Sequence, residues 1–195
     1  MFVVKYSGPF GFIKPWTAVR DGETISQQFL TPSIIMGIEL KLFPELLKEV
    51  EPEYKIQRIL KHRLSYKSVS IQQEMVQSKA YILNKKEKYA RRNNSILKRG
   101  ILINPVLHLA FSENEYAETA IRQHICLCRN EDILLPDNEI IEMTEEQFNS
   151  IEGFELIFEE KEDSFLVGFN RYNKIKPMYG RIFIQGDPVK SDTEE

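Results

Sequence analysis

The sequence predicts an α+β fold: a ferredoxin-like unit with a basic insertion, followed by a small β-rich C-terminal part. Three observations support this prediction. Alternating stretches rich in β-branched and aromatic residues occur along the chain. Apolar residues recur at helical spacing over 31–43 and 113–125. The elements follow the order strand, helix, strand, basic insertion, strand, helix, strand, which is that of a split βαβ unit.

Composition excludes several classes of protein. The chain has 195 residues, 42% hydrophobic and 28% charged, as in ordinary globular proteins. No apolar stretch approaches the ~20 residues of a membrane span, and the N-terminus lacks a signal-peptide pattern. Cys126 and Cys128 are too few for a disulfide scaffold and lack a second Cys/His pair at zinc spacing. We therefore expect a cytoplasmic protein with no cofactor and no metal site.

The first predicted strand, at about 2–7, leads into the Gly- and Pro-rich loop "SGPFGFIKPW". Gly8 and Gly11 allow close backbone approaches that other residues forbid. Lys14 and Trp16 place a cation beside a large aromatic face, a pairing that binds phosphates and stacks bases. We include both in a candidate RNA-binding set, with Arg20 from the same loop. The alternative is that the aromatic residues of this loop only cover one end of the core.

A helix is predicted from Thr31 to about Phe43. Thr31 suits the N-cap and Pro32 the first helical position. Thr31 and Ser33 are candidate phosphate ligands at the helix N-terminus, although capping alone would explain Thr31. Gly37 lies inside the helix, where it costs about 1 kcal/mol relative to Ala. We therefore expect a close neighbour beside Gly37, either the sheet or a bound RNA.

The rest of the chain is divided as follows. Paired strands are expected around 55–75, and Asn84, Asn93 and Asn94 mark turns in the basic stretch 76–99. A strand is expected over 100–111. Because Pro105 has no N–H to donate to a neighbouring strand, the middle of this strand should lie at a sheet edge or form a bulge. Residues 1–135 form an RNA-recognition-like domain, the kind of open sheet that suits single-stranded RNA. Residues 136–187 form the β-rich portion, and 188–195 a disordered tail.

Charge is segregated along the chain, although its net value is only -3. Between Lys79 and Arg99 there are eight Lys and Arg residues against the single acid Glu87. Such a segment fits a polyanion site, and an exposed solvated loop is the alternative. A second basic and aromatic stretch, "NRYNKIKPMYGRIFI", contains Arg181 and has a basic strand end as its alternative. From these stretches the candidate RNA-binding set gains Lys88, Arg91, Arg92, Lys98, Arg99 and Arg181.

Three stretches resemble the Cas five family of CRISPR-associated proteins, part of the RAMP superfamily. The strongest is the N-terminal "FVVKYSGPFGFIKPW" with "FLTPSIIMGIELKLF". The second is "KRGILINPVLHLAF", with an Arg before the strand and a Pro within it. The third is "ICLCRNEDIL", where Cys128 stands at a position usually occupied by Gly.

This resemblance implies a subunit of a type I Cascade surveillance complex, with an RNA-recognition-like fold and a projecting thumb at about 67–100. Such subunits cap the 5′ handle of the crRNA and contact the large and backbone subunits. They meet target DNA through the complex.

One subtype of the family is an endoribonuclease. Its catalytic Tyr corresponds here to Gln27, and no Lys-His pair follows the thumb. We therefore expect a non-catalytic subunit. The alternatives are a metal-independent endoribonuclease that processes precursor crRNA and a protein-interaction module without an RNA role.

Overall fold

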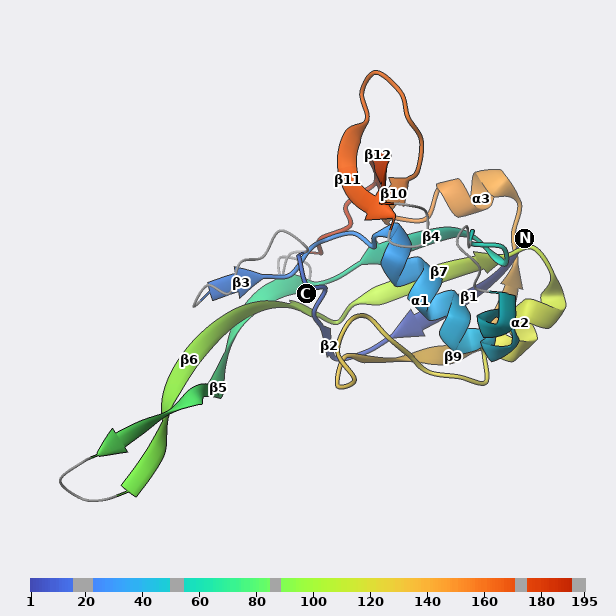
Figure 1. Cartoon of the computed structure of the whole chain (residues 1–195). Helices are drawn as coiled ribbons and strands as arrows, with labels where there is room; N and C mark the ends of the chain where they lie inside the picture. Colours follow the sequence, from blue (N-terminus) through green and yellow to red (C-terminus); the bar gives the residue numbers. More distant parts are fainter. Residues whose placement is uncertain (16–22, 50–54, 85–88, 171–174, 191–195) are drawn as a thin grey trace.

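The structure, a computed structural model, describes residues 1–15, 23–49, 55–84, 89–170 and 175–190 (Figure 1). Its fold is α+β, with mostly antiparallel strands and few helices. The strands are β1 (Phe2–Ser7), β2 (Phe10–Gly11), β3 (Glu23–Ile25), β4 (Ile59–Ser65), β5 (Ser68–Asn84), β6 (Tyr89–Ile103), β7 (Val106–Phe111), β8 (Ile125–Cys126), β9 (Ile133–Glu142), β10 (Gly153–Ile157), β11 (Phe165–Asn170) and β12 (Lys176–Gln185). The helices are α1 (Pro32–Leu42), η1 (Pro44–Glu49, a 3-10 helix), α2 (Asn114–Ala120) and α3 (Glu145–Asn149).

Eight strands form the main sheet, in the order β11-β12-β10-β4-β7-β1-β9-β8. The predicted first strand is confirmed as β1, which pairs antiparallel with both β7 and β9. Adjacent residues of a strand point to opposite faces. Val4 accordingly packs in the core that contains α1 and α2, whereas Val3 packs against Phe148 of α3 on the other face.

The C-terminal strands extend this same sheet. β10 pairs with β4, β12 with β10, and β11 with β12. The predicted domain boundary after residue 135 lies inside β9. Within the predicted tail, the Pro188 carbonyl accepts from the Tyr66 N–H, and the Lys190 N–H donates to the Tyr66 carbonyl. Residues 191–195 lie outside the described residues.

Strands β5 and β6 form a long hairpin that projects from the body (Figure 1). At about 3.3 Å per residue, the 17 residues of β5 span roughly 55 Å. Asn93 and Asn94 lie within β6, so the turns predicted there are wrong. Pairing with β5 on both sides of Asn93 outweighs the preference of Asn for turns, although the register shifts between Gln77 and Tyr81. β6 contacts β2 and β3 at the root of the hairpin, where it joins the body.

Two further sequence predictions need correction. The strand predicted over 100–111 is divided between β6 and β7 by a turn at Asn104, whose φ is 47°, and Pro105. Pro105 precedes β7 and therefore removes no hydrogen bond from this central strand. In addition, α3 was not predicted, although Thr144 and Gln147 form a reciprocal capping box at its start.

Helix α1 begins as predicted, with Thr31 at the N-cap, but the Thr31 side chain makes no capping hydrogen bond. The close packing of Gly37 against the sheet, one of the two neighbours expected for it, is absent among the described residues, and an approach by RNA stays a prediction. No heavy atom of the described residues lies within 4 Å of the position that a Cβ would occupy. Gly37 is exposed and faces open space. Among the helices that the structure describes, none is long and apolar enough to cross a membrane.

Candidate nucleic-acid interface

The root of the hairpin joins the loop after β1 to the β6–β7 turn. Phe10 and Gly11 pair with Ile103 and Leu102 of β6. The backbone N–H of Asn104 donates to the Pro9 carbonyl at 3.0 Å. A Cβ on Gly11 would lie 2.5 Å from a Leu127 methyl carbon, and one on Gly8 would lie 2.4 Å from the Ile133 carbonyl oxygen. These two glycines therefore permit the close approach that the sequence predicted for them.

The ring of Phe12 contacts two guanidinium groups at this root. Arg99 and Arg129 lie 5.4 and 5.3 Å from the centroid of the buried Phe12 ring, within cation–π range. Glu74 of β5 bridges the same two arginines, with N–O distances of 2.7 Å to each. We call Phe12, Glu74, Arg99 and Arg129 the root cluster. It joins both strands of the hairpin to the body.

Arg129 is further held by the buried carboxylate of Asp132. Its Nε and Nη2 atoms donate to the two Asp132 oxygens at 2.9 and 2.7 Å, a bidentate arrangement. These hydrogen bonds raise the pKa of Arg129. Both arginines of the root cluster are thus compensated by carboxylates of the same chain.

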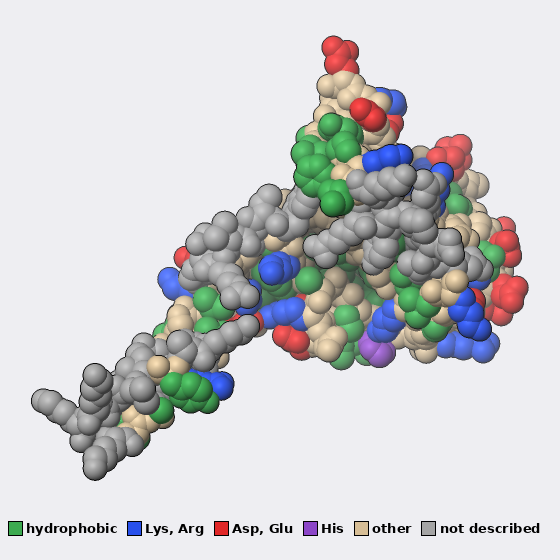
Figure 2. Space-filling model, viewed as in Figure 1, with side chains coloured by type: hydrophobic (Ala, Val, Ile, Leu, Met, Phe, Trp, Pro, Cys, Tyr) green, Lys and Arg blue, Asp and Glu red, His purple; other side chains and the backbone are tan. Residues whose placement is uncertain are grey.

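Three predicted cations have a different environment. Lys14, Arg92 and Lys98 are exposed, and within the described part of the chain none of them pairs with a carboxylate. Arg92 donates to the Tyr81 hydroxyl at 3.0 Å and lies 4.9 Å from the centroid of that ring. Lys98 precedes Arg99 in β6, so it points to the opposite face from the root cluster. Figure 2 shows Lys and Arg side chains gathered where the hairpin joins the body.

The face of the hairpin that carries Arg92 and Lys98 also carries apolar side chains. The β5–β6 register pairs Met75 with Ile96, which are 73% and 60% exposed. Exposed Val69 and Ile71 continue the same row toward the body. A row of exposed apolar side chains of this kind marks a candidate interaction surface.

The remaining predicted residues are separate from this surface. Thr31 and Ser33 lie at the start of α1. Arg181 of β12 pairs with Glu159, and the side chains of Lys161 and Arg181 lower the pKa of this carboxylate. Four predicted residues cannot be placed: Trp16, Arg20 and Lys88 lie outside the described residues, as does the side chain of Arg91.

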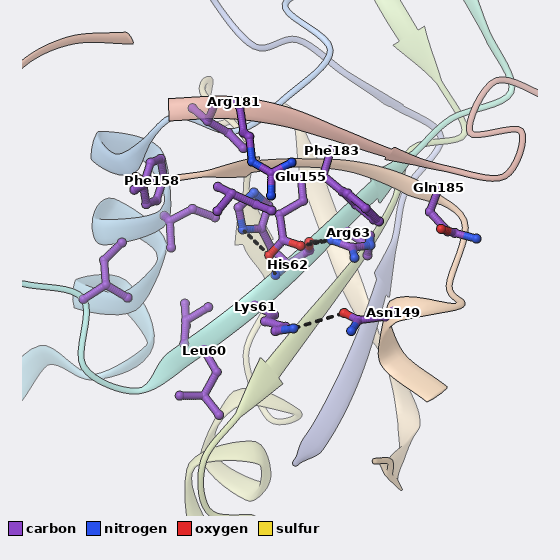
Figure 3. Close-up of a pocket in the computed structure, with 15 residues that line it drawn as sticks. Leu60, Lys61, His62, Arg63, Asn149, Glu155, Phe158, Arg181, Phe183 and Gln185 are labelled. Carbon is purple, nitrogen blue, oxygen red and sulfur yellow. Dashed lines mark hydrogen bonds and ion pairs between the residues drawn. The ribbon is translucent and has the colours of Figure 1, made fainter. Parts of the chain in front are cut away.

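A second polar site lies between β4, β10 and β12, in a cavity of 590 Å³ that we call the sheet pocket. Arg63 and His62 of β4 both lie against Glu155 of β10, and Phe183 lies beside Arg63, whereas Phe158 lines the pocket nearer Arg181 (Figure 3). Arg63 forms an ion pair with Glu155 and stacks on Phe183 at 4.7 Å. Its side chain is almost fully buried.

His62 is neutral in this pocket. Burial, and secondarily the positive charge of Arg63, lower its pKa to about 3. Its Nδ1 atom lies 4.0 Å from the nearest Glu155 oxygen, beyond hydrogen-bonding distance. Its Nε2 atom is buried and has no partner among the described residues. No sequence motif indicated this pocket.

Comparison with known proteins gives one informative result. No protein-family model matches the chain, and no curated protein matches it. One similar solved structure is a chain of a "CRISPR RNA-guided surveillance complex", with a TM-score of 0.52 and 9% sequence identity. The match covers 94% of this chain and 89% of that chain. At this identity the likeness concerns the fold, and it extends over nearly the whole of both chains.

Proposed function

We propose that this chain is a non-catalytic, RNA-binding subunit of a type I CRISPR surveillance complex, of the Cas five family. Its core would be the ferredoxin-like unit of an RNA-recognition-like fold, with the β5–β6 hairpin as the thumb. It would act in the cytoplasm, cap the 5′ handle of the crRNA, and contact the large and backbone subunits. Target DNA would be reached only through the assembled complex.

The observation that carries this proposal is the composition of the root cluster. Phe12, Arg99 and Arg129 come from the three stretches that resemble the family, and all three meet within one contact network. These stretches are far apart in the sequence. Their convergence at the base of a basic hairpin supports a shared role in positioning that hairpin. The fold likeness to a chain of an RNA-guided complex supports the same assignment.

The charge distribution supports RNA as the partner. The cations of the root are compensated by carboxylates, whereas Lys14, Arg92 and Lys98 leave their charge available at the surface. Phosphate contacts from such groups give affinity with little sequence preference. Selection of a particular handle sequence would then require contacts to bases.

The test is incubation of the purified chain with end-labelled repeat RNA in EDTA, with retardation and cleavage both recorded. We expect a retarded band and intact RNA. Discrete cleavage would instead support the endoribonuclease alternative. If no RNA is bound at low salt, the RNA-binding proposal is wrong.

A further inference from the structure

We propose that Arg99 and Arg129 form a phosphate-binding site that Glu74 fills in the unbound chain, and that a phosphate of bound RNA replaces the Glu74 carboxylate. The inference starts from the contacts of Glu74. Its Oε2 atom accepts from Arg99 Nε, and its Oε1 atom accepts from Arg129 Nη1, each at 2.7 Å. Guanidinium groups that converge on one oxyanion are also how proteins hold phosphate. Because the ligand is RNA, the inference rests on the proposed function.

Arg99 has hydrogen-bonding capacity that Glu74 does not use. A guanidinium group carries several N–H donors, and in Arg99 only the one on Nε has a hydrogen-bond partner among the described residues. Its two Nη atoms can therefore donate to a further acceptor. A phosphate group can accept such a pair of parallel hydrogen bonds from one guanidinium group.

Arg129 is held in place independently of Glu74. Its Nε and Nη2 atoms donate to Asp132, whose side chain is fully buried, so this pair remains when Glu74 leaves. The Phe12 ring contacts the guanidinium groups of both arginines. A site that is ordered before its ligand binds loses little conformational freedom on binding.

Glu74 is the charged member of the root cluster that is most exposed to solvent. Its side chain is 34% exposed, against 23% for Arg99 and 19% for Arg129. Ion pairs that are partly open to water contribute little to stability, so their replacement costs little. A phosphodiester and a carboxylate each carry one negative charge. The exchange therefore leaves the net charge of the site unchanged.

The site can be reached from the cations of the other hairpin face. Glu74 and Arg99 lie on the face opposite to Lys98, but Glu74 belongs to β5, which pairs with no described strand other than β6. β5 is thus an edge strand, and neighbouring strands lie only about 5 Å apart. An RNA strand that passes around this edge can contact both faces.

The experiment measures the affinity of single-stranded repeat RNA for Glu74→Gln over a range of salt concentrations. If a phosphate must displace Glu74, the variant should bind RNA roughly fivefold more tightly, the combined effect of two partly exposed ion pairs. Its salt slope should be steeper by about 0.7, because the freed arginines attract counterions that RNA then releases. A purely structural role of Glu74 predicts the opposite sign, since its loss would loosen the hairpin and weaken binding.

Glu23→Gln is the matched control. Glu23 is an exposed acid of β3 at the same root, and among the described residues it forms no ion pair with Arg99 or Arg129. This variant loses the same charge and should bind RNA as the wild type does. Adding Arg99→Gln to Glu74→Gln should remove the gain in affinity.

Two NMR measurements complete the test. In the wild type, the carboxyl ¹³C signal of Glu74 should move when RNA is added, because the carboxylate leaves both arginines; this needs no variant to fold. Inorganic phosphate added to Glu74→Gln separates a free phosphate from an RNA phosphate. Shifts of the Arg99 side chain with inorganic phosphate, without a gain in RNA affinity, would overturn the proposal.

The proposal is also overturned if folded Glu74→Gln binds RNA no more tightly than the wild type, if Glu23→Gln gives the same gain, or if the Glu74 signal stays fixed while RNA binds. In each of these cases the wild type still binds RNA, so the proposed function stands. If neither the wild type nor Glu74→Gln binds RNA at low salt, the proposed function is wrong and this inference falls with it.

Discussion

The hairpin and the sheet differ in how they use their cations. In the sheet and at the root, Arg63, Arg129 and Arg181 each pair with a carboxylate of the same chain. On the face of the hairpin opposite the root cluster, Arg92 and Lys98 have no such partner among the described residues. The difference indicates that cations of the first kind hold the fold and those of the second kind are available to a polyanion. The number of cations in a segment does not distinguish these roles.

The largest expected effect concerns the buried pair of the sheet. Arg63→Met leaves Glu155 as a buried and unpaired charge, which should lower the free energy of unfolding by about 3–5 kcal/mol. Urea denaturation measures this change. Arg181→Met breaks a partly exposed pair that water screens, so its effect on the free energy of unfolding should be much smaller. Equal losses in both variants would contradict the division between buried and exposed pairs.

Acid should weaken the sheet through its histidines. Burial lowers the pKa of His62 to about 3 and that of His108 to about 4, against an ordinary value of 6.5. Below pH 6.5 these two histidines bind protons in the unfolded chain but stay neutral in the folded chain. Stability is therefore full above pH 6.5 and falls as the pH drops toward 4, by up to about 1.4 kcal/mol per pH unit for each histidine.

Urea denaturation between pH 7.5 and pH 5.5 tests this dependence, in the range where most carboxylates stay ionised. The double variant His62→Leu/His108→Leu should show a flatter profile than the wild type. A wild-type profile that is already flat would contradict the burial of these rings. The hairpin from 68 to 103 contains no histidine, so it contributes nothing to this slope.

The smallest expected effect is at Gly37. Because no described atom lies within 4 Å of its Cβ position, Gly37→Ala should stabilise α1 by about 0.5–1 kcal/mol. Thermal or urea unfolding measures the gain. A loss of stability would show that some part of the chain does approach this helix closely.

Local patterns predicted part of this molecule well. The alternation in 2–7 and the Thr31-Pro32 helix start correspond to β1 and α1. The Thr144 to Gln147 capping pattern also lies in the sequence and could have indicated α3, which was not predicted. These features depend on residues only a few positions apart.

The site could not be predicted in this way. Glu74 and Arg129 are 55 positions apart, and only the path of the hairpin brings them together. His62 and Glu155 meet because β10 pairs with β4, a pairing that no local pattern encodes. Gly37 shows the converse error, since a glycine in a helix indicates missing side-chain bulk but not whether anything occupies the space.

The most direct test of the account is the affinity of single-stranded repeat RNA for two variants at matched low salt. Arg92→Gln/Lys98→Gln removes two unpaired cations of the hairpin. Arg122→Gln removes an exposed cation just after α2, an element on the side of the body away from the β5–β6 hairpin (Figure 1). The hairpin variant should bind roughly tenfold more weakly, with a salt slope smaller by about 0.7 for each lost phosphate contact. Arg122→Gln should bind as the wild type does. Equal affinities of the two variants, with both folded, would contradict the claim that the hairpin cations bind RNA.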